Sequence, residues 1–169
     1  MESASFDDVF RSLFNERFGI LYDYLHRLTG DAELADDVAQ ETFVRLYDRG
    51  AMPDAPSAWM VSVAHNLVRD EHRRVERRRR LLAIWQSPRS AEPEAEGRLL
   101  MGERAVEVHR VLRMITRRQS QLLLLRHAGY SYGEIARALR VAPGSVGTLL
   151  VRATKAFVTA YGKVSHASD

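Results

Sequence analysis

The chain has 169 residues, of which 46% are hydrophobic and 28% are charged. This composition is typical of a globular protein, and the length allows one or two small domains but not a barrel enzyme. Cysteine is absent, which excludes a disulfide scaffold, a thiolate zinc site and a cysteine nucleophile. The formal net charge is only +3, so the distribution of charge along the chain is more informative than its total.

No targeting or membrane segment is expected. The N-terminal stretch 1–8 has no basic residues followed by an apolar core, unlike a secretory signal. The longest uninterrupted apolar run, Leu81 to Trp85, has five residues. Because a membrane span needs about 20 apolar residues, we expect a soluble, cytoplasmic protein with no membrane insertion.

Helices are predicted throughout the N-terminal half. Apolar residues recur at steps of three and four between Phe6 and Leu28, which predicts a first amphipathic helix. Gly30 is expected to end this helix, and the side chain of Asp31 can cap a second helix that continues to Tyr47.

A third helix is predicted after a loop that contains Gly50, Pro53 and Pro56. Ser57 is expected to cap this helix, which runs to about Arg80. Three helices with a shared apolar face make a small bundle, so residues 1–80 are predicted to form one domain.

Residues 81–103 are predicted to be a flexible linker. Their central part has two prolines, several acids and no periodic apolar stripe. The linker divides the chain into the domain 1–80 and a second domain, 104–169, and the expected fold class is all-α.

The second domain contains the spacing of a helix-turn-helix motif. A helix from about Arg117 to Ala128 is followed by Gly129, and Ser131 and Glu134 have the spacing of a capping box. The box predicts a short helix over 132–139. After a turn, Pro143 is expected in the first turn of a helix that continues to about Ala160. The small Ala136 would allow the two helices to approach, and Val146 would fill their interface.

The second helix of such a motif enters the major groove of DNA. Arg152 could donate two hydrogen bonds to guanine, Thr148 could make a mixed contact, and Val151 could touch a thymine methyl group. Lys155 and the helix start near Ser145 are better placed for phosphates. The alternative is a plain helical hairpin with a basic exterior.

Acidic and basic residues are segregated along the chain. Residues 31–48 contain six acids and one base, a net charge of −5. Residues 57–80 contain seven arginines and three acids, a net charge of +4, and residues 104–169 contain eleven bases and three acids, a net charge of +8. This indicates one surface for a basic partner and two for a polyanion, unless the runs are ordinary solvated helix faces.

In the arginine-rich helix, Asn66, Arg69 and Arg73 recur at helical steps with Arg77 beyond them, and this row could follow a phosphate backbone.

Three motifs resemble the sigma factors of bacterial RNA polymerase. The segment 31–47, DAELADDVAQETFVRLY, resembles the acidic helix of sigma region two, and the segment from Ala58 to Asp70 resembles the promoter-reading helix that follows it. The segment from Ser131 to Phe157 resembles the helix-turn-helix of sigma region four. Their order, over about residues 6–160, matches the extracytoplasmic-function group, which retains only these two domains.

The resemblance implies three binding surfaces and no cofactor. One would dock on the coiled-coil clamp of the largest catalytic subunit of core RNA polymerase, the second would contact and open the minus-ten element, and the third would read the double-stranded minus-thirty-five element. The implied polymerase-binding residues are Asp36, Asp37, Gln40, Glu41 and Val44; those for the minus-ten element are Asn66, Arg69, Arg73 and Arg77; those for the minus-thirty-five element are Ser145, Gly147, Thr148, Val151, Arg152 and Lys155. Members of this group are often held inactive by an anti-sigma factor, which is expected here too.

The sequence departs from the family pattern at several positions. The loop from Asp48 to Pro56 is short and lacks an aromatic residue often found there, so no pocket for a flipped minus-ten base is assigned. Gly147 occupies a position that is often basic, and Arg140 occupies that of a turn glycine. If the turn requires a positive φ, Arg140 holds strain of about 1 kcal/mol, which a phosphate contact could offset.

Two other functions compete with a promoter-specificity factor. One is an autonomous DNA-binding regulator whose N-terminal bundle is a dimerisation or sensory module, although such a protein has no evident use for the acidic segment. The other is an enzyme or metal protein built on His65, Asp70, Glu71 and His72. No His-Glu-x-x-His motif, Gly-rich phosphate loop or nucleophile triad is present, so neither catalysis nor a metal is expected.

Overall fold

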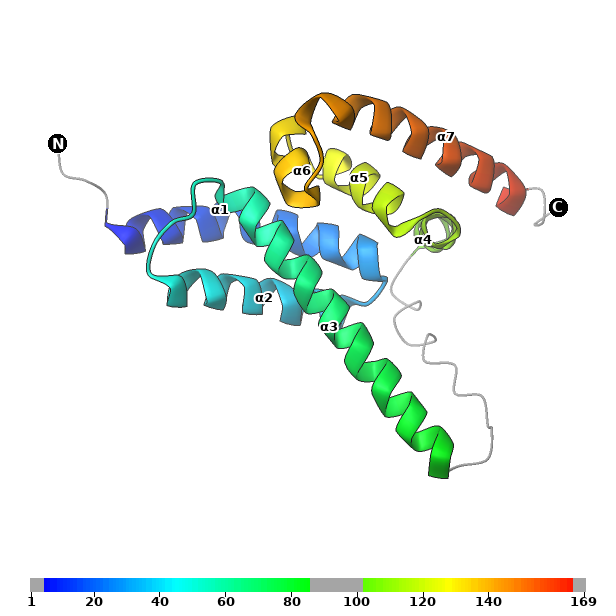
Figure 1. The fold of residues 1–169 in the computed structure, drawn as a ribbon, viewed down its shortest axis with the longest axis horizontal. Helices are drawn as coiled ribbons and strands as arrows, with labels where there is room; N and C mark the ends of the chain where they lie inside the picture. The colour runs from blue at the N-terminus through cyan, green and yellow to red at the C-terminus, as the bar shows by residue number, and fades with distance from the viewer. Residues whose placement is uncertain (1–4, 86–101, 166–169) are drawn as a thin grey trace.

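The computed structural model describes residues 5–85 and 102–165, and over these residues the chain is helical with short turns (Figure 1). The N-terminal domain consists of α1 (Phe6–Thr29), α2 (Ala32–Arg49) and α3 (Pro56–Trp85). The C-terminal domain consists of α4 (Glu103–Met114), α5 (Arg117–His127), α6 (Tyr132–Leu139), a turn of 3-10 helix η2 (Pro143–Ser145), and α7 (Val146–Ser165). The expected all-α class is confirmed. Over the described residues, no helix combines the length and the hydropathy needed to cross a membrane.

The break between the first two helices lies where the local sequence predicts it. Gly30 closes α1 in the left-handed conformation with φ of 73°, and the carboxylate of Asp31 accepts a hydrogen bond from the backbone N–H of Leu34 at 3.0 Å. Both features are short-range, because a left-handed residue suits glycine and a cap needs only a side chain and a nearby N–H.

The ends of α3 differ from expectation. The prediction that Ser57 caps this helix is wrong: α3 already begins at Pro56, and the backbone N–H of Trp59 donates to the carbonyl oxygen of Ala55. Proline is favoured at the first helical position because it lacks the N–H that would have no partner there. At the other end α3 continues to Trp85, past Arg80, because arginine and leucine favour helix and the next proline is Pro88. The first part of the predicted linker is therefore helical, and 86–101 lie outside the described residues.

The helix-turn-helix is confirmed. α6 has the predicted bounds, and both hydrogen bonds of the Ser131–Glu134 capping box are present. Ala136 and Val146 are both buried at the contact between α6 and the start of α7. α4 was not predicted, and its Val111 and Leu112 become buried only through tertiary packing.

Arg140 ends α6 with φ of 54° and ψ of 50°, the only non-glycine residue with positive φ in the described part of the chain. The strain foreseen for this position therefore has a geometric basis. Arg140→Gly should raise the free energy of unfolding by about 1 kcal/mol, because glycine adopts this conformation without a Cβ clash. Thermal unfolding should show a midpoint higher by about 2–4 °C.

Arg137→Gly is the matched control for that substitution, because Arg137 lies exposed within α6. Glycine inside a helix is unfavourable, so this variant should lose about 1 kcal/mol instead. Equal shifts of the same sign in both variants would contradict the assignment of strain to Arg140.

Candidate nucleic-acid and protein interfaces

An acidic face runs along α2. Asp37, Gln40, Glu41 and Val44 follow one another at helical spacing, and Asp36 lies beside them. The opposite side of the helix is buried in the bundle through Val38, Thr42 and other residues. We call the outward set, Asp36, Asp37, Gln40, Glu41 and Val44, the acidic face.

The acidic face has one carboxylate with no partner and one exposed apolar side chain. Asp36 accepts a hydrogen bond from Gln40 Nε2 at 2.7 Å, and Glu41 pairs with Arg45 at 2.8 Å. Asp37 makes no hydrogen bond or ion pair with any residue in the described part of the chain. Val44 is 52% exposed. Carboxylates around an exposed valine suit a basic protein partner that also offers an apolar contact.

An arginine face lies on α3 and consists of Asn66, Arg69, Arg73 and Arg77, all exposed. Arg69 donates a hydrogen bond to Asn66 Oδ1 at 2.7 Å, and Arg73 lies 4.0 Å from the carboxylate of Asp70. These contacts on an exposed surface are weak and can be exchanged for contacts to phosphate. The second half of α3 projects away from the bundle (Figure 1), so the arginine face is open to a long polyanion.

The residues predicted to read the minus-thirty-five element do not all point the same way. Thr148, Val151 and Lys155 share the outward stripe of α7, and Val151 is 70% exposed. Ser145 is exposed in η2 just before this stripe. Thr148 and Val151 are exposed where a recognition helix meets base edges, and Ser145 and Lys155 are exposed beside them, where phosphates would lie.

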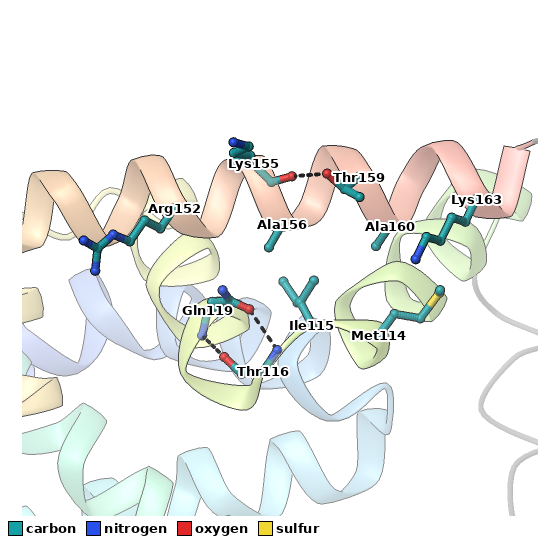
Figure 2. Close-up of a pocket in the computed structure, with 10 residues that line it drawn as sticks. All are labelled: Met114, Ile115, Thr116, Gln119, Arg152, Lys155, Ala156, Thr159, Ala160 and Lys163. Atoms are coloured by element: carbon teal, nitrogen blue, oxygen red, sulfur yellow. Dashed lines mark hydrogen bonds between the residues drawn. The ribbon is translucent and has the colours of Figure 1, made fainter.

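Arg152 and Gly147 lie on the two flanks of that stripe. Arg152 lines a groove of about 460 Å³ between α7 and the α4–α5 corner, together with Lys155 and Lys163 (Figure 2). Gly147 faces α6, where a Cβ atom would lie 3.7 Å from the ring of Tyr132. A side chain at position 147 would therefore pack on Tyr132 and not extend straight out of the protein.

Sequence reasoning missed a cation on α5. The Arg126 guanidinium lies 5.4 Å from the centroid of the Tyr132 ring, a cation–π contact next to the start of α7. Both side chains are exposed. Nothing in the local sequence indicates this proximity, because Arg126 precedes the helix-turn-helix by one loop.

His65 is a half-buried residue that links α3 to α1. Its Nε2 atom lies 2.6 Å from the hydroxyl oxygen of Tyr24 in α1. Burial, reinforced by the charges of Arg117 and Arg69, lowers the pKa of His65 to about 4, so the ring is neutral at pH 7. Within residues 5–85 and 102–165, no three histidine or acidic side chains are placed to hold a metal ion.

Two family models and several known proteins match this chain. The family model of Sigma-70 region 2 matches residues 13–79, and that of Sigma-70, region 4 matches residues 105–157. SigL of Mycobacterium tuberculosis, an ECF RNA polymerase sigma factor, is 31% identical over 156 residues, with 86% of this chain and 85% of SigL covered. The chain belongs to the extracytoplasmic-function (ECF) group of sigma factors. This sigma factor binds core RNA polymerase and directs it to promoters.

Two further relatives extend the comparison. The ECF sigma factor SigX of Bacillus subtilis is 25% identical over 158 residues, with 88% of this chain and 81% of SigX covered. The sigma factor RpoE of Bartonella quintana, crystallised with the anti-sigma factor NepR, has the same fold with a TM-score of 0.67 at 18% identity, over 90% of this chain and 96% of RpoE. The match to region 2 includes the acidic and arginine faces of this sigma factor, and the match to region 4 includes α6 and the outward stripe of α7.

Proposed function

We propose that this sigma factor binds polymerase and the two promoter elements through three separate surfaces. The acidic face docks on the coiled-coil clamp of the largest catalytic subunit of core RNA polymerase. The arginine face contacts and opens the minus-ten element, and Ser145 with the outward stripe and flanks of α7 reads the minus-thirty-five element. The observation that carries the proposal is that one helical chain exposes an acidic face and two basic faces on separate elements.

In this proposal the protein has no catalytic chemistry of its own and acts in the cytoplasm, where core polymerase and promoter DNA are found. His65, which precedes Asn66 of the arginine face, is hydrogen-bonded to Tyr24 and held neutral. Its role is structural, which leaves the polymerase to perform all the chemistry of transcription.

Arg152→Ala should lower run-off transcription from preferred promoters about tenfold, because one bidentate arginine–guanine contact contributes about 1–3 kcal/mol of discrimination. The experiment uses core polymerase and a randomised promoter library. Wild-type protein should enrich a two-part promoter, and the variant should relax selection at one base pair of the minus-thirty-five element.

Lys163→Ala is the control for Arg152→Ala. Lys163 lines the same groove but lies about three turns further along α7, beyond the reach of the same base pairs. It should leave the selected sequence unchanged. If Arg152→Ala selects the same promoter with the same strength as wild type, Arg152 does not read DNA. Wild-type protein that binds promoter DNA alone but supports no initiation would contradict the polymerase-dependent role itself.

We also propose that an anti-sigma factor holds this sigma factor inactive. The proposal is supported by the fold shared with RpoE, which was crystallised with such a partner. Purification of the tagged sigma factor from its native cells should recover one stoichiometric protein that suppresses run-off transcription. Recovery of fully active sigma factor with no inhibitor bound, under all growth conditions tried, would overturn this part of the proposal.

A further inference from the structure

A cavity lies where the two domains of this sigma factor meet. α5 packs against α1, and α6 packs against α3 (Figure 1). The cavity has a volume of about 270 Å³ and is lined by side chains of α1, α3, α4 and α5 and of the corner between α4 and α5. This volume is near the lower end of the range for small-molecule sites, which begins at about 300 Å³. None of the residues assigned to polymerase or promoter DNA lines the cavity.

The lining of the cavity combines apolar and basic side chains. Leu28 of α1 and Val68 of α3 contribute apolar surface from the N-terminal domain, and further apolar side chains come from α4 and α5. The lining also contains four basic side chains and no acidic one. These basic residues are His72, His109, Arg113 and Arg117. Arginines beside an apolar surface are suited to an anion that has an apolar body.

The corner between α4 and α5 determines where the two arginines lie. α4 ends one residue after Arg113, and α5 begins at Arg117, so the two arginines flank a two-residue corner. The corner is fixed by the capping box of Thr116 and Gln119, whose two hydrogen bonds have lengths of 3.3 Å and 3.0 Å. Guanidinium groups on a fixed backbone can bind one phosphate group through several parallel hydrogen bonds.

The charge of Arg117 is not paired within the described part of the chain. Its side chain makes no hydrogen bond or ion pair with any described residue. Glu71, which precedes His72 in α3, is paired with Arg74 at 2.9 Å, and the first turn of α5 contains no acid. Burial and then the charge of Arg117 lower the pKa of both His65 and His72, so this charge acts across the cavity on α3. An anion in the cavity would supply the opposite charge.

We propose that this cavity binds a small organic phosphate of the nucleoside monophosphate class. The phosphate group binds Arg113 and Arg117, and the ring of His72 donates a further hydrogen bond. The apolar body of the ligand packs against Leu28 and Val68, which a bare phosphate ion could not cover. The ligand contacts both domains, so its binding stabilises the whole protein. The inference is independent of the proposed roles of the acidic face, the arginine face and α7.

Calorimetric titration of the full-length protein with AMP, GMP, CMP and UMP at physiological salt tests the site. At least one of these nucleotides should bind at a single site with a Kd below about 100 μM. The corresponding nucleoside lacks the phosphate and inorganic phosphate lacks the apolar body, so each should bind at least about tenfold more weakly. The inference is overturned if none of the four nucleotides reaches this affinity, or if the nucleoside or inorganic phosphate binds as tightly as the nucleotide.

Substitutions of Arg117 and His72 locate the bound nucleotide. Arg117→Ala should weaken its binding at least about tenfold, because a hydrogen bond between charged groups is lost. Arg117→Lys keeps the charge but not the planar geometry, so its affinity should lie between those of wild type and Arg117→Ala. His72→Ala should weaken binding about threefold, because one hydrogen bond from α3 is lost. Wild-type affinity in Arg117→Ala overturns the inference.

Arg11→Ala is the matched control, since Arg11 is exposed on α1 outside the cavity and the charge changes equally. It should bind the nucleotide as wild type does, and equal weakening in Arg11→Ala and Arg117→Ala would show a general attraction of anions to a basic protein. Thermal unfolding separates binding from folding. Without nucleotide both variants should unfold at the wild-type midpoint, because both arginines are exposed. Saturating nucleotide should raise the midpoint of wild type and Arg11→Ala, and an unchanged midpoint in wild type overturns the inference.

Discussion

Reversal of charge on the acidic face should abolish assembly with core RNA polymerase. In the double variant Asp37→Lys with Glu41→Lys, two carboxylates of an exposed helix face become two cations. We expect the affinity for core polymerase to fall at least about 100-fold, because like charges then meet at an interface selected for opposite charges. Native gel shift or fluorescence anisotropy with labelled sigma factor measures the loss, and run-off transcription should disappear with it.

We expect the loss of binding without a loss of stability because neither carboxylate has a structural role in the protein. Asp37 has no partner in the described part of the chain, and Glu41 pairs only with its neighbour Arg45 on the surface. Substitution of either should leave the fold unchanged, because exposed ion pairs contribute little to stability. Asp23→Lys with Asp54→Lys is the matched control, since both acids are exposed outside the acidic face and the total charge changes equally. Equal loss of binding in the two double variants would show a general charge effect and no docking at α2.

Mild acid should destabilise the protein through His65. The folded-state pKa of about 4 lies below the ordinary value of 6.5, so the unfolded chain binds a proton that the folded chain does not. Stability from this group is complete above pH 6.5 and is lost as the pH falls toward 4. Between pH 7 and pH 5 the free energy of unfolding should fall by about 2 kcal/mol from this group alone, on the basis of 1.36 kcal/mol per pKa unit.

Urea unfolding of wild-type protein and His65→Gln at both pH values isolates this contribution. Glutamine cannot titrate but can still hydrogen-bond to Tyr24, so the variant should lose about 2 kcal/mol less than wild type on acidification. The pKa of His72 is also lowered, by burial and by the charge of Arg117, although the charge of Glu71 raises it. Because His72 is present in both proteins, its contribution to the pH dependence cancels in the comparison. Identical pH dependence in the two proteins would mean that His65 is not held neutral by the fold.

The residues that begin and end helices could be predicted from the sequence. Gly30, Asp31 and the Ser131–Glu134 box act through backbone groups a few residues away, so their roles at helix ends follow from spacing alone. For Arg140 the expectation came from the resemblance, because the family has a turn glycine at this position, and the structure has the positive φ there. The acidic face on α2 and the arginine face on α3 could also be predicted from the sequence, because helical periodicity determines which residues share a face without knowledge of the tertiary packing.

Contacts between segments far apart in the sequence could not be predicted from spacing. Ser57 was expected to be a cap but lies 8% exposed in the packed structure. There Ser57 faces the carboxyl group of Glu134. Burial by itself raises the pKa of Glu134, but hydrogen bonds from Ser131 and Ser57 and the charge of Arg17 have the larger combined effect. The pKa of Glu134 is therefore lowered. Arg152 shares a helix with Val151, yet lies beside a groove that exists only because α4 and α5 meet α7. No pattern in the sequence indicates that Arg126 stacks on Tyr132 or that His65 is bonded to Tyr24.

The amino-acid sequence alone was sufficient for the all-α class, the helix-turn-helix and the segregation of charge, because these depend on periodicity and on interactions between near neighbours. The contact of α6 with α3, the neutral state of His65 and the buried Tyr130 hydroxyl required the tertiary structure. They depend on residues up to about a hundred positions apart, and only the burial of shared apolar surface brings such residues together.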